Sequence, residues 1–190
     1  MHSRSSIRIR VWLLGGTLAL LALAALGGLS LHRQIHQYDA LIVAAGKQYG
    51  VDACLVWSVI WHESHFSASR RGTHGELGLM QVTEAAAHEW ARASGTIGFK
   101  RIDLLKPEVN ISAGAWYLSR ALKFWAHKRR PVPYALAEYN AGRSNTIRWS
   151  MADGDDDRMF ESQISYPGTR RYVQDILKVY RWTSTHGLGP

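Results

Sequence analysis

Cysteine is nearly absent from this chain, since Cys54 is the only one among 190 residues. A single thiol excludes an internal disulfide framework. Cys54 also lies well beyond the apolar segment near the N-terminus, so it is not a lipid-bearing cysteine beside a signal sequence. Its apolar neighbours indicate a buried structural thiol.

The chain also lacks internal repeats, low-complexity linkers and a convincing pair of strands. Fifteen acidic residues stand against 23 lysines and arginines, which gives a formal net charge of +8. This excess favours an anionic partner such as a cell-envelope polymer or a membrane surface, although a solvated basic surface is an equal alternative. The basic residues are scattered without a nucleic-acid-binding motif, so we expect no nucleic acid partner.

No cofactor is expected, and the histidines do not form a zinc-protease motif. His62 and His65 flank Glu63, but that motif needs its second histidine four residues after the first, where this chain has Phe66. With no third ligand identified, we predict no metal site.

A run without charged residues covers residues 11–31. Its length matches a transmembrane helix of roughly 20 residues, and the arginines before it favour an N-terminus in the cytoplasm. We therefore expect residues 1–33 to anchor the chain in a membrane, with residues 34–190 on the outer face. A cleavable signal segment is the alternative, because Ala22-Leu23-Ala24 offers a cleavage site. Both interpretations export the domain.

Apolar spacing predicts that the exported part is mainly helical. Gly50 is an expected helix stop, Asp52 and Thr83 are expected N-caps, and Pro107 fits a first helical turn. A short hairpin is possible around residues 71–77. The expected helices cover residues 38–49, 52–65, 84–93, 107–126, 134–140 and 169–182.

Tryptophan is abundant, with eight in the chain. Most of these side chains are expected in the core, and the alternative for some is a groove that stacks on sugar rings.

One carboxylate, Glu63, ends an apolar helix and precedes a glycine-rich loop. The apolar neighbours Val59, Ile60, Trp61 and Phe66 should desolvate it and raise its pKa. A carboxyl group that stays protonated near neutral pH is the general acid that glycosidic bond cleavage requires.

Four further motifs follow the Glu63-Ser64 pair in order. They read Gly-Leu-Met-Gln at 78–81, Asn-Ile-x-x-Gly-x-x-Tyr-Leu at 110–118, Ala-Leu-Ala-Glu-Tyr-Asn-Ala-Gly at 135–142 and Thr-Arg-Arg-Tyr-Val at 169–173. Together they resemble the catalytic domain of the Slt-type lytic transglycosylases of family 1, over about residues 38–183. The resemblance implies a mainly α, lysozyme-like (goose-type) domain with an active-site cleft, covering residues 34–190.

The resemblance also implies a role for each matching residue. Glu63 is the expected sole catalytic acid/base. Two positions depart from the pattern, because Gly168 replaces a family glutamate and Gly72 stands where some relatives carry a hydroxyl. The expected substrate-binding residues are Ser64, Met80, Gln81, Tyr117, Tyr139, Asn140 and Tyr172.

The activity implied is that of a lyase acting on peptidoglycan. It would cleave the β-1,4 bond between N-acetylmuramic acid and N-acetylglucosamine without water and leave 1,6-anhydro ends. A goose-type muramidase that uses Glu76 as a second carboxylate is one alternative, although Glu76 is more simply a solvent-facing or loop-bracing residue. A non-catalytic glycan-binding scaffold is the other. A secretion or appendage complex of the envelope is a further expected partner. With peptidoglycan as substrate, the membrane that holds the anchor is expected to be the bacterial inner membrane, with residues 34–190 in the periplasm.

Overall fold

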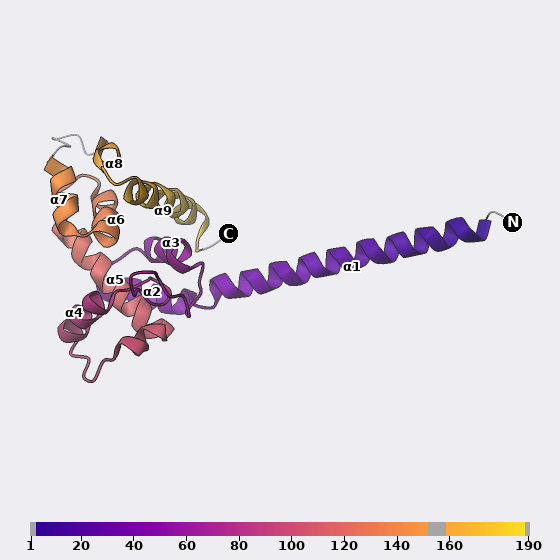
Figure 1. Ribbon diagram of the computed structural model, residues 1–190, viewed down its shortest axis with the longest axis horizontal. Helices are drawn as coiled ribbons and strands as arrows, with labels where there is room; N and C mark the ends of the chain where they lie inside the picture. Colours follow the sequence, from indigo (N-terminus) through magenta and orange to yellow (C-terminus); the bar gives the residue numbers. More distant parts are fainter. Residues whose placement is uncertain (1–2, 152–158, 189–190) are drawn as a thin grey trace. The chain divides into compact units, whose positions relative to one another are not determined.

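The computed structural model (Figure 1) describes the backbone of residues 3–151 and 159–188, and the side chains of residues 20–151 and 159–188. The chain divides into two compact units, Met1–Gln37 and Tyr38–Pro190. Each unit is described by itself below.

The first unit is one helix, α1 (Ser3–His36). Among the residues that the structure describes, no helix is long and apolar enough to cross a membrane. The described residues therefore do not support the predicted membrane span at residues 11–31. The side chains of residues 11–19, the first part of that span, lie outside the described part of the chain.

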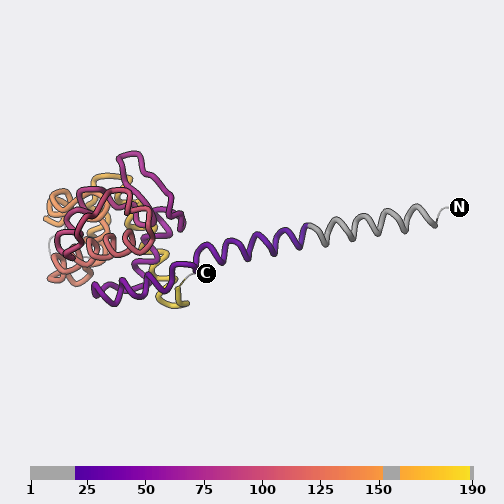
Figure 2. Tube along the Cα trace, turned by 90° about the horizontal axis from the view of Figure 1, so that it is seen from below, coloured from indigo at the N-terminus to yellow at the C-terminus, as the bar shows by residue number. Residues whose placement is uncertain are grey.

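The second unit is built almost entirely of helices, as predicted. Figure 2 shows the segment that follows α3 looping out from them. The elements are α2 (Asp39–Tyr49), α3 (Ala53–Ser64), α4 (Glu84–Ser94), the 3-10 helix η1 (Arg101–Leu105), α5 (Pro107–Phe124), α6 (Pro131–Ala141), α7 (Arg143–Met151), α8 (Phe160–Gln163) and α9 (Pro167–His186).

Local sequence signals set the helix boundaries before the site. Gly50 ends α2 in the left-handed conformation, at φ 68°. Asp52 caps α3 by accepting a hydrogen bond of 2.8 Å from the Cys54 N–H. Thr83 caps α4 in the same way, accepting from the Ala86 N–H at 3.2 Å. These three predictions are confirmed.

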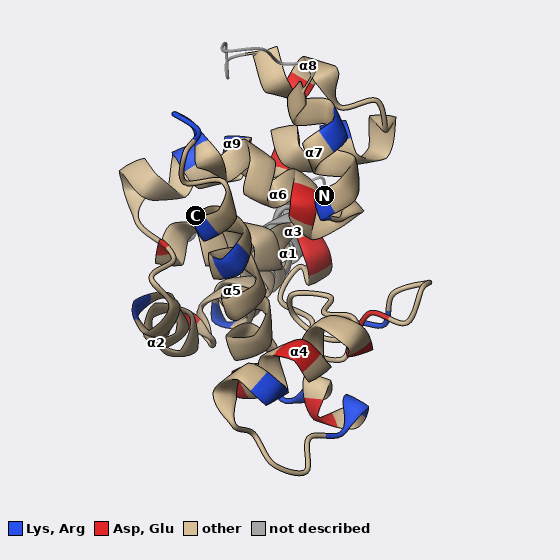
Figure 3. Ribbon diagram, turned by 90° about the vertical axis from the view of Figure 1, so that its left-hand side faces the viewer, with Lys and Arg blue, Asp and Glu red and all other residues tan. Residues whose placement is uncertain are grey.

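Helix packing brings both ends of the second unit together. Helix α5 packs against α2, α4 and α6, while α3 packs against α2 and the C-terminal α9, which also contacts α6. Lysines and arginines lie on helices throughout this unit (Figure 3). Four tryptophans are buried in it, as expected of the majority, whereas Trp61 and Trp116 are partly exposed and Trp182 is 39% exposed. The buried four are Trp57, Trp90, Trp125 and Trp149.

Several details of the fold differ from the sequence-based expectation, among them a helix and the hairpin. Helix α7 was not predicted, because its surface is largely polar and buries only Thr146 and Trp149. The predicted hairpin is reduced to isolated antiparallel bridges that pair Leu77 with Arg71 and with Val82.

Candidate active site

Glu63 occupies the last turn of α3, and the chain turns sharply directly after it. His65 caps the helix with a left-handed backbone, at φ 49°, and its N–H donates to the Trp61 carbonyl at 3.2 Å. Phe66 follows at φ 62°. Two consecutive residues other than glycine in this region carry backbone strain, which is common where a structure holds a functional side chain in place.

The carboxyl group of Glu63 has the properties of a general acid. Burial raises its pKa from the ordinary value of 4.5 to about 7, against the opposing effect of a hydrogen bond from Tyr172. The Tyr172 hydroxyl donates to Oε1 of Glu63 at 2.8 Å. The charge of Glu76 raises the pKa further. Near neutral pH, both the protonated and the ionised form of Glu63 are therefore populated.

Two tyrosines of the site remain hydrogen-bond donors at every physiological pH. Burial, and then the charge of Glu63, holds the pKa of both Tyr139 and Tyr172 well above the usual tyrosine value. The Tyr139 hydroxyl donates to the Met80 carbonyl at 2.9 Å. The Tyr117 ring meets the Tyr139 ring edge to face, with centroids 5.8 Å apart. Tyr139 thus joins α5 and α6 to the loop that carries Met80.

Asn110 fixes that loop, and the sequence analysis did not include it among the site residues. Its side chain is fully buried and makes three hydrogen bonds. Oδ1 accepts from the Met80 N–H at 2.7 Å, while Nδ2 donates to the carbonyls of Leu77 and Leu104 at 2.7 and 2.8 Å. Gly78 is needed here, because a Cβ on it would collide with the Asn110 amide. The signal was present, since Asn110 begins the motif at residues 110–118.

Gln81 braces the same loop from a left-handed backbone, at φ 46°. Its Nε2 donates to the carbonyl of Gly78 at 2.9 Å and to that of Arg70 at 3.3 Å. Gln81 therefore holds the loop around the cleft, and its expected contact with substrate stays a prediction.

A cavity of about 340 Å³ gathers four of the predicted residues. Glu63, Gln81, Tyr139 and Asn140 all line it. Two further hollows share lining residues with it: one of about 120 Å³ shares Gln81 and Tyr139 and adds Tyr117. The other, of about 410 Å³, shares Asn140 and adds Tyr172. The predicted aromatic and amide side chains therefore follow one cleft.

Ser64 and Met80 are placed differently. The Ser64 side chain is buried and donates to the Ile60 carbonyl at 3.2 Å, within its own helix. Met80 is fully buried, and a Cβ on Gly114 would collide with its sulfur. Both residues shape the site from inside, so direct substrate contact by either remains untested.

Glu76 enters the cleft beside Gly72. A Cβ on Gly72 would collide with Oε2 of Glu76 and would lie 2.9 Å from Oε1 of Gln81. Oε2 of Glu76 also accepts a hydrogen bond of 3.0 Å from the His74 N–H. Glu76 lines the same cavity as Glu63. The carboxylate thus fills the space beside the position where some relatives carry a hydroxyl.

Glu138 is a second buried carboxylate near the cleft, and it is occupied elsewhere. Arg143 donates to its Oε1 from Nε at 3.0 Å and from a terminal nitrogen at 2.7 Å. The Trp125 indole N–H donates to Oε2 at 2.8 Å. Both carboxylate oxygens are therefore engaged in holding the helix that carries Tyr139.

The wall beyond Asn140 comes from the start of α9. The Thr169 hydroxyl donates to Oδ1 of Asn140 at 2.7 Å. Gly168, which replaces the family glutamate, lines this wall, and nothing lies within 4 Å of a Cβ built on it. Within the described residues, no group of three or more histidine, cysteine, aspartate or glutamate side chains is arranged to hold a metal ion.

The sequence matches the Transglycosylase SLT domain family over residues 40–159. Among curated proteins, the membrane-bound lytic murein transglycosylase C of Pectobacterium atrosepticum is 33% identical over 132 residues, which are 66% of this chain and 37% of that protein. The membrane-bound lytic murein transglycosylase F of Desulfosudis oleivorans is 30% identical over 115 residues, covering 59% of this chain and 23% of the relative. The chain thus spans less than half the length of these two relatives.

Solved structures show the same fold. An inactive glutamate-to-glutamine mutant of lytic transglycosylase Slt from Pseudomonas aeruginosa superposes with a TM-score of 0.70 and 26% identity, covering 82% of this chain and 25% of that one. The 70 kDa soluble lytic transglycosylase of Escherichia coli gives 0.71 at 24% identity, covering 79% of this chain and 24% of that one. The predicted Slt-type, lysozyme-like fold is therefore confirmed, and the chain belongs to the Transglycosylase SLT domain family.

Proposed function

We propose that this protein is a peptidoglycan lytic transglycosylase. It cleaves the β-1,4 bond between N-acetylmuramic acid and N-acetylglucosamine, and Glu63 acts as both acid and base. The observation that carries the proposal is the position of the Glu63 carboxyl group, which is hydrogen-bonded to Tyr172 and buried in the wall of a cleft, where burial raises its pKa to about 7. A group with that pKa can both give and take a proton near neutral pH.

The proton passes through Glu63 twice in this scheme. Protonated Glu63 first gives its proton to the glycosidic oxygen, and the bond from that oxygen to C1 of the muramic acid breaks. The ionised carboxylate then removes the proton of the C6 hydroxyl, whose oxygen bonds to C1 and closes the 1,6-anhydro ring. The net reaction consumes no water. The hydrogen bond from Tyr172 stabilises the ionised form between the two steps.

The charge on the cleft fits an anionic polymer. Arg70 and Arg71 line the cavity beside Glu63, and within the described part of the chain their guanidinium groups have neither a hydrogen bond nor an ion pair. Peptidoglycan carries carboxylates on its lactyl groups or stem peptides. Gln81, Tyr139 and Asn140 lie on the same walls and would position the acetamido sugar.

Mass spectrometry of the fragments released from purified sacculi tests the proposal. We expect anhydro-muropeptides from the wild type, and a loss of roughly 100- to 10,000-fold in Glu63→Gln, which cannot transfer a proton. Binding of sacculi without release of fragments would refute the enzyme and favour the scaffold alternative.

Glu76 supports one competing activity, hydrolysis. It brings a second carboxylate into the cavity of Glu63, as a water-activating base would require. Products with reducing ends would identify a muramidase, and Glu76→Gln should then abolish their formation. A transglycosylase should instead keep forming anhydro ends in Glu76→Gln.

We infer that the first unit attaches the catalytic unit to the periplasmic face of a bacterial inner membrane. The support is the run without charge at residues 11–31, the arginines before it, and the words "membrane-bound" in the names of the relatives. Recovery of the full chain in the membrane fraction, but of residues 34–190 in the soluble fraction, is expected. A mature N-terminus near residue 25 would instead identify a cleaved signal. An envelope-spanning secretion or appendage complex stays a prediction as partner.

A further inference from the structure

The proposed chemistry does not use His62, although this residue directly precedes Glu63 in the sequence. Neighbouring residues of a helix project about 100° apart, so their side chains do not face each other. Glu63 lines the cleft, whereas His62 lines the hollow of about 410 Å³ that also contains Tyr172. The imidazole of His62 therefore lies against α9, which packs along α3.

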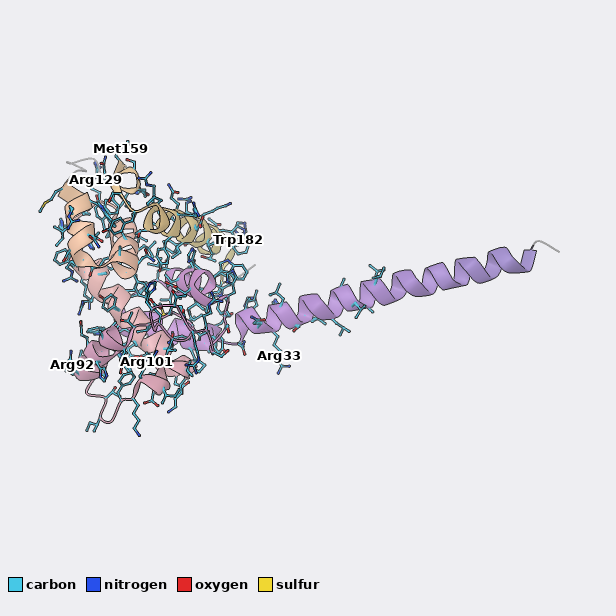
Figure 4. All side chains as sticks on the ribbon, in the orientation of Figure 1. Arg33, Arg92, Arg101, Arg129, Met159 and Trp182 are labelled. Atoms are coloured by element: carbon cyan, nitrogen blue, oxygen red, sulfur yellow. The ribbon has the colours of Figure 1, made fainter. Side chains whose placement is uncertain are left out.

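The His62 ring contacts the ring of Tyr172. Their centroids are 4.7 Å apart and their planes meet edge to face, at 73°. Trp182, which Figure 4 labels, projects from the last turns of α9, whereas Tyr172 belongs to the first half of this helix and is only 5% exposed. The hydroxyl group of Tyr172 donates to Glu63. His62 and Glu63 thus hold one tyrosine at two points, its ring and its hydroxyl group.

The position of a tyrosine hydroxyl group depends on the orientation of its ring. The ring of Tyr172 turns about two side-chain bonds, and one side of it borders the hollow. His62 forms part of the wall beside it. Without the imidazole, the hollow would extend along the ring and leave it free to turn away from Glu63. The hydrogen bond to Glu63 therefore depends on what fills this space.

His62 is neutral in the pH range in which Glu63 titrates. Burial lowers the pKa of His62 from its usual value of 6.5, the charge of Asp175 opposes this effect, and His65 adds to it. The Asp175 carboxylate lies 4.0 Å from Nε2 of His62, too far for a direct hydrogen bond. The imidazole therefore contributes a ring, and not a charge, to the contact with Tyr172.

We propose that His62 is a positioning residue for the reaction, which holds the ring of Tyr172 so that the hydroxyl group donates to Glu63. His62 acts through Tyr172 and not on the substrate. In the proposed function of the cleft, on which this inference rests, that hydrogen bond stabilises the ionised carboxylate between the two proton transfers. The other titratable groups around the contact, which the test leaves unchanged, are Glu76, Tyr139, His65, Asp175, Tyr166 and Arg171.

The test measures the rate at which the full chain cleaves purified sacculi as a function of pH. His62→Ala weakens the bond that lowers the pKa of Glu63, so the falling limb above pH 7 should move to higher pH by up to about one pH unit. Tyr172→Phe has no such bond to lose, so adding His62→Ala to it should move the limb no further. His62→Phe, which keeps a ring, should retain the limb of the wild type.

His88→Ala is the matched control. The imidazole of His88 also meets an aromatic ring edge to face, that of Phe99 at 5.2 Å. It also lies near a carboxylate, that of Glu84 at 3.7 Å. His88 belongs to α4 and lines none of the three hollows of the cleft, so the limb should stay in place in this variant.

A second readout does not require activity. The NMR resonance of the Glu63 carboxyl carbon, identified by its absence from Glu63→Gln, follows the ionisation of this group in the full chain. His62→Ala should raise the pKa of Glu63, whereas His62→Phe should leave it at about 7. Circular dichroism establishes that each variant is folded. If His62→Ala does not fold, His62→Asn, which also lacks the six-atom contact face of a ring on Tyr172, takes its place.

The outcomes separate this inference from the function on which it rests. If His62→Ala raises the pKa of Glu63 but the wild type releases no fragments from sacculi, the proposed function fails and the positioning role stands. If fragments are released but neither readout responds to His62→Ala, only the positioning role is refuted. A shift that persists in the Tyr172→Phe background, or that His62→Phe shows in full, would also overturn this role, because His62 would then act by another route.

Discussion

The raised pKa of Glu63 makes a quantitative prediction about stability. Between pH 4.5 and about 7, the folded state retains a proton that the unfolded chain has already released. The stability due to this group is complete below pH 4.5 and is lost as the pH rises through 7. The gap between 4.5 and about 7, at about 1.36 kcal/mol per pH unit, corresponds to roughly 3 kcal/mol.

Glu63→Gln isolates this contribution, because glutamine has nearly the same shape and does not titrate. Urea unfolding of both proteins at pH 5 and pH 9 gives two differences in unfolding free energy. Since every other group titrates in both proteins, its contribution cancels. We expect the wild type to lose about 2 to 3 kcal/mol relative to Glu63→Gln over this interval.

The control is Glu108→Gln, at an exposed position in the first turn of α5. Its unfolding free energy should follow that of the wild type between pH 5 and pH 9. If the wild type and Glu63→Gln change in parallel to within about 0.5 kcal/mol, Glu63 has an ordinary pKa, and the argument for it as the acid fails.

Three further predictions concern Glu63 and the residues that shape the cleft. The rate of cleavage should fall above pH 7 as Glu63 ionises, which gives the pH–rate profile a falling limb. Tyr172→Phe removes a hydrogen bond that lowers the pKa of Glu63, so it should move this limb to higher pH. Glu76→Gln removes a charge that raises this pKa, so it should move the limb to lower pH. Asn110→Ala should lower the unfolding free energy by about 3 kcal/mol in urea titrations, because it removes three buried hydrogen bonds, to the Met80 N–H and to the carbonyls of Leu77 and Leu104. Gly168→Glu should raise the thermal midpoint, with about 1 kcal/mol gained from a carboxylate that replaces glycine in the first turn of α9. The arguments would be contradicted in turn by an unchanged pH–rate limb, by an Asn110→Ala protein as stable as the wild type, or by a Gly168→Glu protein less stable than the wild type.

Features that depend on interactions between residues close in the sequence could be predicted from the sequence. Asp52 and Thr83 cap helices because their side chains reach backbone N–H groups only a few residues away. The raised pKa of Glu63 was also predictable, since its apolar neighbours lie on the same helix and in the following turn.

Features that depend on contacts between residues far apart in the sequence could not be predicted. The hydrogen bond between Tyr172 and Glu63 joins residues 109 positions apart. The role of Asn110 depends on a loop about 30 residues earlier in the chain. The predicted helix after Pro133 began too late, because α6 starts at Pro131, where a proline fits the first turn without needing its N–H. Tertiary packing decides the contacts of Tyr172 and Asn110, whereas the start of α6 follows the local preference of proline for a first helical turn.

The pairing of α3 with α9 has a consequence for the growing chain. The acid lies in the first third of the sequence, whereas the tyrosine that binds it belongs to the last helix. A ribosome that has not yet released residues 167–186 holds a polypeptide whose carboxyl group lacks both this donor and the cover of α9. The active form of Glu63 is therefore completed only after α9 has been synthesised, and a chain that ends before residue 167 would lack the Tyr172 donor.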